Sequence, residues 1–216
     1  MKSPAAFLRA MTSVLVLIAC AASVPRTNAA DSLDASGPNF PKVGSSWVVA
    51  YKLGGSFGTS TGTFPVSVVG DQVWKGQPAW VLQSRSTLYF DLQGRQLARG
   101  NGSTILESWD PYWSGREWPL SVGKSWTSSP KLTNHSNGQT STVKFTHTVQ
   151  AVEEVTTPAG TFETLKIVHE SEFNRETEWW SPKLGVVVKK RTERKPANRL
   201  GAGVVDEEVV SYTAGP

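Results

Sequence analysis

Residues 142–152 read Thr-Val-Lys-Phe-Thr-His-Thr-Val-Gln-Ala-Val, and the side chains alternate in character along the whole stretch. The odd-numbered residues from Val143 to Ala151 point to one side, and the even-numbered Thr, Lys and Gln residues point to the other. A period of two residues is that of a β-strand, in which successive side chains face opposite ways. The stretch therefore predicts a strand with one buried and one wet face, as antiparallel sheets allow.

Similar short runs, rich in Val, Thr, Trp, Tyr and Phe, extend outward from this strand between Gly, Asn, Pro and Ser. This pattern is typical of all-β proteins, and helical periodicity is almost absent. The predicted strands are 47–51, 63–69, 72–74, 79–86, 88–91, 96–99, 104–109, 142–152, 162–173, 176–180, 186–194 and 204–212. About ten to twelve strands in one sheet must curl or close. We expect an all-β domain over residues 41–216, formed by a single antiparallel, strongly curved sheet or open barrel, mostly a meander.

One motif occurs twice. PKVGSSW, residues 41–47, resembles PLSVGKSW, residues 119–126, and in each a glycine turn leads into a strand that opens on tryptophan. The spacing is too long for a solenoid repeat. Two strand entries of one type explain the recurrence, and a duplicated half-domain is the bolder interpretation.

The N-terminus has the form of a secretory signal peptide. Lys2 and Arg9 precede an uncharged stretch, residues 10–22, that is too short for a permanent membrane span. Cys20, the only cysteine, follows Leu-Ile-Ala and occupies the position of a lipid-bearing cysteine in bacterial lipoproteins. We predict a signal peptide over residues 1–19, lipidation of Cys20 and a flexible tether over residues 20–40. Cleavage before Asp31 by an ordinary signal peptidase is the alternative.

Charge and composition restrict the partners. Cleavage before Cys20 removes Lys2 and Arg9 and lowers the formal net charge from +4 to +2, which argues against nucleic acid. Basic residues cluster over 189–199, where a solvated strand face and loop are expected. Contact with anionic lipid head groups or cell-wall polymers is the alternative. The domain has no disulfide. Three histidines without a cysteine make a structural zinc site improbable, so neither a metal nor a cofactor is expected.

Residues 109–118, Trp-Asp-Pro-Tyr-Trp-Ser-Gly-Arg-Glu-Trp, hold four aromatic side chains in ten positions. One interpretation is a stacking platform for sugar rings or an apolar ligand, with Arg116 as a hydrogen-bonding group. The candidate ligand-binding residues are then Trp109, Tyr112, Trp113 and Arg116. The interpretation we favour is that these rings plug an open end of the curved sheet.

No catalytic residues are predicted. No Gly-x-Ser-x-Gly motif is present, and His147 and His169 each share a predicted strand face with apolar residues. Several carboxylates occur in pairs, such as Glu176 with Glu178. Pairs two residues apart on a wet strand face arise readily and carry little weight as a hydrolase signature.

Residues 157–167, Thr-Pro-Ala-Gly-Thr-Phe-Glu-Thr-Leu-Lys-Ile, and residues 179–189, Trp-Trp-Ser-Pro-Lys-Leu-Gly-Val-Val-Val-Lys, carry a resemblance. Together with Val-Gly-Lys-Ser-Trp at 122–126, they resemble a group of uncharacterised bacterial exported β-rich proteins and lipoproteins. The match covers roughly residues 119–191, and the family implies no activity and no catalytic residues.

The sequence as a whole leads us to expect a non-catalytic binding or structural module of the cell envelope, held by its lipid anchor at the outer membrane. A soluble periplasmic or secreted protein is the alternative location. A carrier of a lipid or other apolar ligand and a glycan-binding or glycan-processing protein are the alternative functions. Ligand identity and oligomeric state are left open.

Overall fold

The computed structural model describes residue 33 and residues 35–56 and 58–216. This part of the chain contains fourteen strands and no α-helix, which confirms the all-β fold class. The strands are β1 (Ser46–Gly55), β2 (Ser60–Trp74), β3 (Gln77–Gln83), β4 (Thr87–Phe90), β5 (Gln96–Asn101), β6 (Thr104–Trp113), β7 (Ser125–Ser128), β8 (Lys131–Asn134), β9 (Thr140–Thr142), β10 (Phe145–Thr157), β11 (Gly160–Glu170), β12 (Asn174–Ser181), β13 (Val186–Arg194) and β14 (Gly203–Thr213). Among the described residues, no helix is long and apolar enough to cross a membrane.

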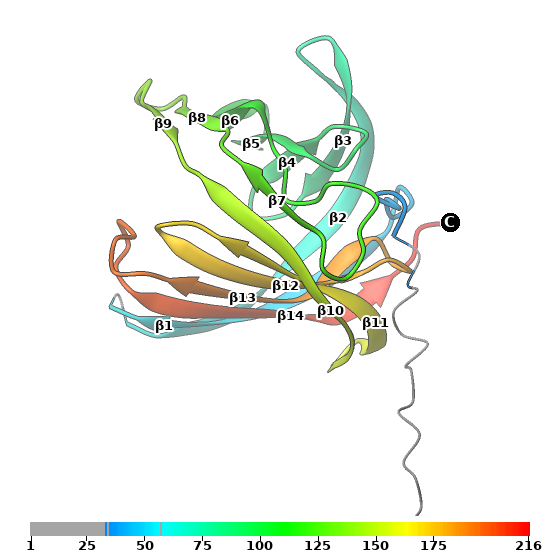
Figure 1. Cartoon of the computed structure of the whole chain (residues 1–216). Coiled ribbons are helices and arrows are strands. Elements are labelled where there is room, and N and C mark those ends of the chain that lie inside the picture. Colours follow the sequence, from blue (N-terminus) through cyan, green and yellow to red (C-terminus); the bar gives the residue numbers. More distant parts are fainter. Residues whose placement is uncertain (1–32, 34, 57) are drawn as a thin grey trace, which may run out of the picture.

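All fourteen strands join one antiparallel sheet that is not closed into a barrel, in the order β7-β10-β11-β12-β13-β14-β1-β2-β3-β4-β5-β6-β8-β9. Two meanders, β1–β6 and β10–β14, meet where β1 pairs with β14, from Ser46↔Thr213 to Gly55↔Gly203. Figure 1 shows the sheet bent into two limbs, with the long strands β2 and β10 running between them. Strong curvature gives the sheet a concave inner face.

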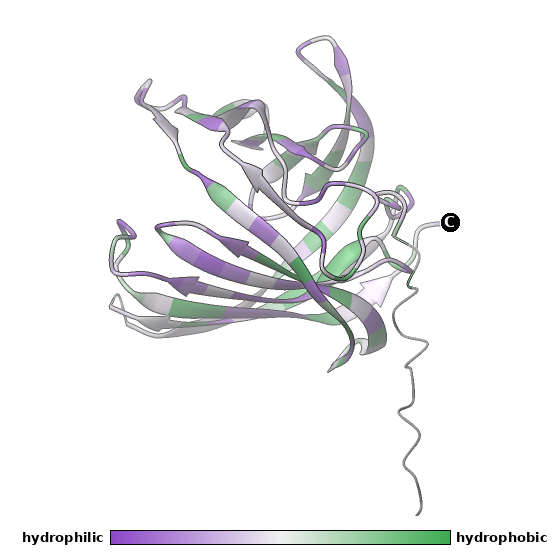
Figure 2. Ribbon diagram, in the orientation of Figure 1, coloured by the Kyte–Doolittle hydropathy of each residue, from purple (hydrophilic) through white to green (hydrophobic). Residues whose placement is uncertain are grey.

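Alternating residues on the strands supply the core. Hydrophilic and hydrophobic bands follow one another along the strands, most clearly on β10 (Figure 2). One cluster gathers the side chains of β1, β2, β3, β13 and β14, among them Trp47, Val66 and Trp80. A second lies under β10, β11 and β12 and contains Trp126, Ile167 and Trp180. Burying large aromatic and aliphatic side chains stabilises this disulfide-free domain.

The two copies of the repeated motif form equivalent turns. Gly44 and Gly123 have φ values of +85° and +87°, which glycine adopts without the steric cost that a Cβ would bring. The Gly44 amide donates to the Val68 carbonyl oxygen of β2, and the Gly123 amide donates to the Val149 carbonyl oxygen of β10. Both receiving strands have a register shift at this point. The turns are thus two strand entries of one type, as expected.

The described part of the predicted tether lies against the domain. The Leu120 amide donates to the carbonyl oxygen of Ala35, which is buried, and the Asn39 side chain donates to the carbonyl oxygen of Pro182. The Phe40 ring stacks on Trp80, with ring centroids 4.4 Å apart. Residues 35–40 therefore contact the sheet directly, while the predicted signal peptide and Cys20 lie outside the described residues.

Candidate functional site

The concave face of the sheet holds a partly open cavity of about 750 Å³, lined by strands of both limbs. Its inner end is apolar, and aromatic side chains from four different places in the chain, Phe40, Trp47, Trp80 and Phe90, form much of its wall. The Trp80 ring contacts two of the others, with centroid distances of 4.4 Å to Phe40 and 6.0 Å to Phe90. This end offers a ligand a rigid apolar surface.

The opposite end of the cavity carries a buried ion pair. Glu178 on β12 is 4% exposed, and its two carboxylate oxygens accept hydrogen bonds from Arg116 Nε at 2.8 Å and Arg116 Nη2 at 2.9 Å. Burial alone would raise the pKa of Glu178, but the positive charge of Arg116 beside it outweighs this effect and lowers the pKa to about 2. Glu178 is therefore a carboxylate at neutral pH, paired across 62 residues of sequence.

Two histidines lie behind this carboxylate. His169 Nε2 is 3.4 Å from Glu178 Oε1, and His169 Nδ1 is 2.7 Å from His147 Nδ1 on the neighbouring strand β10. His147 Nε2 is 2.8 Å from the Ser128 hydroxyl. Burial, followed by the nearby His169 ring, lowers the pKa of His147 to about 3, so His147 is neutral at physiological pH.

A second set of charges crosses the cavity floor on β12, β13 and β14. Lys190 Nζ is 2.8 Å from Glu207 and 4.0 Å from Glu176, and Arg85 contacts Glu207 from the far side at 3.3 Å. The carboxylate of Glu176, followed by that of Glu207, raises the pKa of Lys190 against the opposing effect of burial. The polar end is thus built from matched charges rather than from one sign.

The candidate ligand-binding residues are only partly brought together. Trp109, Trp113 and Arg116 line the cavity, whereas the Tyr112 ring is covered by Arg95, whose guanidinium carbon is 3.9 Å from the ring centroid. Trp109, Tyr112 and Trp113 are all half-buried. The Trp113 ring packs edge-on against His169, with centroids 5.7 Å apart. Aromatic side chains of this segment therefore form part of the cavity wall beside the buried ion pair.

Trp118 contributes to packing below the cavity. Its ring lies 5.1 Å from that of Trp180, and its Nε1 donates to the Gln93 carbonyl oxygen at 2.8 Å. This contact joins the loop after β6 to the turn between β4 and β5. Trp118 thus acts as a packing residue that also borders the cavity.

Sequence reasoning missed His169, Glu176 and Glu178 as members of this site. The pairing of β11 with β12 sets His169 directly opposite Glu176 and brings Glu178 beside it, while Arg116 arrives from a distant loop. One signal was available in the sequence. Two glutamates, spaced Glu-x-Glu, lie on one face of a predicted strand, and a short turn separates this strand from the preceding one, which carries the histidine. Predicting that the carboxylates lie beside the histidine would have required the register in which the two strands pair.

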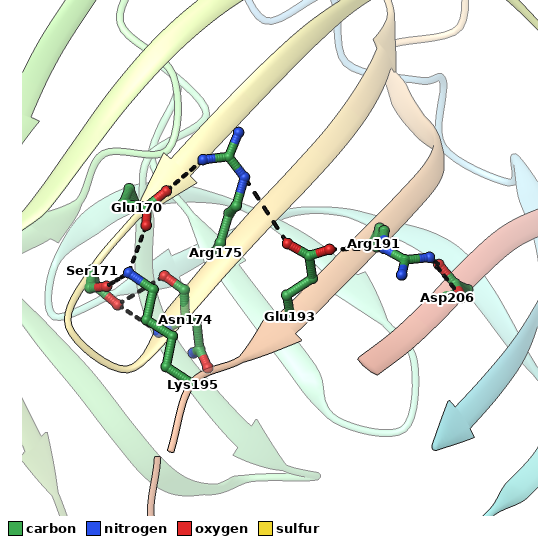
Figure 3. A network of polar contacts seen from close by, with 8 residues as sticks. All are labelled: Glu170, Ser171, Asn174, Arg175, Arg191, Glu193, Lys195 and Asp206. Atoms are coloured by element: carbon green, nitrogen blue, oxygen red, sulfur yellow. Dashed lines mark hydrogen bonds and ion pairs between the residues drawn. The ribbon is translucent and has the colours of Figure 1, made fainter. Parts of the chain in front are cut away.

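Three of the basic residues over 189–199 form ion pairs with neighbouring carboxylates: Lys190, Arg191 and Lys195. Figure 3 shows a row of alternating charges in which Arg175 contacts Glu170, and Arg191 contacts both Glu193 and Asp206. Lys195 Nζ is 2.5 Å from Glu170 and 2.7 Å from the Ser171 carbonyl oxygen. The segment is only partly the solvated strand face expected from the sequence, because Lys189 and Lys190 line the cavity while Arg191 is exposed.

Known proteins resemble this chain in structure but not in sequence. No protein-family model matches the sequence, and no curated protein matches it. A candidate lipoprotein of Parabacteroides distasonis shares 15% identity at a TM-score of 0.43, over 84% of this chain and 100% of its own. A candidate exported protein of Bacteroides fragilis with a YmcC-like fold shares 14% identity at 0.44, over 81% and 98%. The hypothetical lipoprotein YmcC of Escherichia coli shares 15% identity at 0.41, over 80% and 85%. The function is therefore argued from this chain's own residues.

Proposed function

We propose that the domain is a non-catalytic binding module of the cell envelope, whose cavity holds a ligand with an apolar body and a polar end. The observation that carries this proposal is the cavity of about 750 Å³ inside the curved sheet. Pockets for small ligands commonly measure about 300–1,000 Å³ and combine an apolar lining with a few placed polar groups. The aromatic wall formed by Phe40, Trp80 and Phe90 suits the apolar body of the ligand. Arg116, Glu178 and Lys190 suit its polar end.

The hydroxyl and imidazole groups near the cavity do not favour hydrolysis. Ser128 contacts His147, but a histidine whose pKa is about 3 is a weak general base at neutral pH, since an effective base has a pKa near the working pH. Glu178 contacts His169, whereas the histidine beside Ser128 is His147, so Glu178 does not orient the imidazole next to the hydroxyl. These groups support a structural role for the Ser128–His147 pair.

The envelope location is part of the same proposal. Export by the signal peptide and lipidation of Cys20 would hold the domain at the outer membrane, facing the periplasm or the cell surface. Several acyl chains on one cysteine suffice for stable anchoring, because each buried methylene contributes about 0.8 kcal/mol. The contacts of residues 35–40 would then hold the sheet close to the end of the tether.

A cavity-filling variant tests the binding function. Leu88 lines the cavity, and Leu92 lies on an exposed turn outside it, so Leu88→Trp and Leu92→Trp make a matched pair. The delipidated proteins are titrated with the apolar fluorophore N-phenyl-1-naphthylamine, and thermal melts confirm that each variant is folded. Leu88→Trp is expected to lose most of the fluorescence enhancement while Leu92→Trp retains it.

A second cavity-lining change, Leu82→Phe, keeps the test decisive if Leu88→Trp unfolds. Equal binding by the wild type and both lining variants would contradict the proposal. Mass spectrometry of organic extracts of the natively purified protein then identifies the natural ligand. If soluble oligosaccharides displace the fluorophore and lipids do not, the ligand is a glycan and the proposed apolar ligand is wrong.

A further inference from the structure

Three side chains of metal-ligand type converge at the polar end of the cavity. His169 on β11 and Glu176 on β12 are directly paired in the register of these strands, and Glu178 is the next residue on the same face of β12. One ligand atom from each of the three lies within 4.8 Å of the others. Imidazole nitrogen and carboxylate oxygen are the donors that zinc and related divalent transition metals accept.

The ring nitrogen of His169 gives an independent indication of a ligand. His169 is 2% exposed, and its Nε2 atom has no hydrogen-bond partner within the described part of the chain. Its nearest acceptor, Glu178 Oε1, is 3.4 Å away, beyond the usual 2.9–3.0 Å of an N–H···O bond. Buried polar atoms are nearly always paired, and within the described residues this nitrogen has only the long contact with Glu178.

The groups around the cluster are arranged as the support of a metal ligand. Histidine ligands usually donate their second ring N–H to a neighbour, which fixes the tautomer and leaves the first nitrogen free to bind. His169 Nδ1 can donate to His147 Nδ1 at 2.7 Å, and His147 Nε2 can in turn donate to the Ser128 hydroxyl. In this tautomer, His169 Nε2 keeps its lone pair free and lies 3.4 Å from Glu178 Oε1.

The carboxylates are held in similar fashion. Arg116 fixes Glu178, and the Thr192 hydroxyl donates to Glu176 at 3.2 Å. Lys190 Nζ is 2.8 Å from Glu207 and 4.0 Å from Glu176, so the ion pair with Glu176 is the longer of the two.

We propose that His169 Nε2, Glu176 and Glu178 bind one divalent transition-metal ion of the zinc class, with a further coordination position open to the cavity. Two ligand atoms on a tetrahedral zinc ion lie about 3.4 Å apart, so the cluster must contract slightly. The Glu176 side chain, 26% exposed and next to the cavity, has room for the rotation this requires. The site is independent of whether the apolar end holds a ligand.

The test is Co²⁺ binding by the tag-free full chain after treatment with EDTA, because tetrahedral Co²⁺ absorbs visible light. The wild type is expected to retain about one Co²⁺ per chain after equilibrium dialysis, and Zn²⁺ should bleach the absorption. Glu176→Gln and His169→Gln are expected to lower the affinity by about tenfold or more, in line with the known sensitivity of metal sites.

Two controls separate this site from adventitious binding. Glu163→Gln makes the same chemical change at an exposed position of β11, and His135→Gln removes the exposed histidine. Both variants should bind Co²⁺ as the wild type does, and thermal melts without metal establish folding. No retained Co²⁺ in the wild type, or wild-type affinity in folded Glu176→Gln, would overturn the proposal. Loss of binding in His135→Gln alone would place the ion at the surface and overturn it as well.

Discussion

Replacing Arg116 with methionine should destabilise the domain far more than its position in a loop suggests. The change removes both hydrogen bonds to Glu178, which is 4% exposed, and leaves that buried charge with only the 3.4 Å contact to His169. Breaking a buried ion pair by removing one member typically costs about 3–5 kcal/mol. The lowering of the Glu178 pKa from 4.5 to about 2 corresponds to about 3 kcal/mol for all its charged and hydrogen-bonding neighbours together. Both magnitudes predict a loss of about 3 kcal/mol in the free energy of unfolding.

Urea denaturation at pH 7 in the presence of EDTA measures this loss. Arg85→Met is the matched control, because the Arg85 side chain is 58% exposed and its contact with Glu207 is 3.3 Å long. Exposed ion pairs contribute about 0–1 kcal/mol, so the control should lose little. Adding Glu178→Met to Arg116→Met removes the unpaired charge and should restore much of the stability. A loss in Arg116→Met no larger than that of the control would refute the reasoning.

Two further predictions rest on the structure and a third on the sequence. Because the folded pKa of Glu178 lies below the unfolded value, its stabilisation is complete above about pH 4.5 and is lost as the pH falls toward 2; acid titrations in EDTA should show a shallower fall in Glu178→Gln. Gly185→Ala places a Cβ against the Asn39 carbonyl oxygen and should lower the melting temperature more than Gly138→Ala, which has a similar φ but open space; equal melts would argue against the contact. Cys20→Ala should abolish fatty-acid labelling and release the protein from membranes, unless cleavage occurs before Asp31.

The elements with regular alternation were predictable from the sequence. The stretch at 142–152 falls within β9, β10 and their short connection, and the predicted strand 186–194 coincides with β13. By contrast, β8 and β9 went unnoticed, because they are three or four residues long and have no buried face to impose a pattern. The pairing of β1 with β14 is a long-range contact that no local signal encodes.

The cavity and its polar end were harder to predict for a different reason. Inward-facing residues such as Trp80 and Val188 look the same in sequence whether their sheet closes on itself or leaves a space between its limbs. The curvature that decides this depends on the whole sheet. The partnership of Arg116 with Glu178 likewise depends on where a loop crosses the sheet, so each residue alone resembled an ordinary surface charge.

The pairing of β1 with β14 also bears on the order in which the chain folds. Nearly every other ladder joins neighbours in sequence and can form as a local hairpin, whereas this one joins the first strand to the last. The entropic cost of closing a loop rises only slowly with loop length, so the long separation of β1 and β14 costs little extra free energy. The contact nevertheless cannot form until β14 is available. Until then β1 and β13 both present bare strand edges, which are prone to pair with other chains. The pairing of β1 with β14 at the centre of the sheet is therefore the last to form. The two strand edges that it covers are the part of the chain most prone to aggregation during folding.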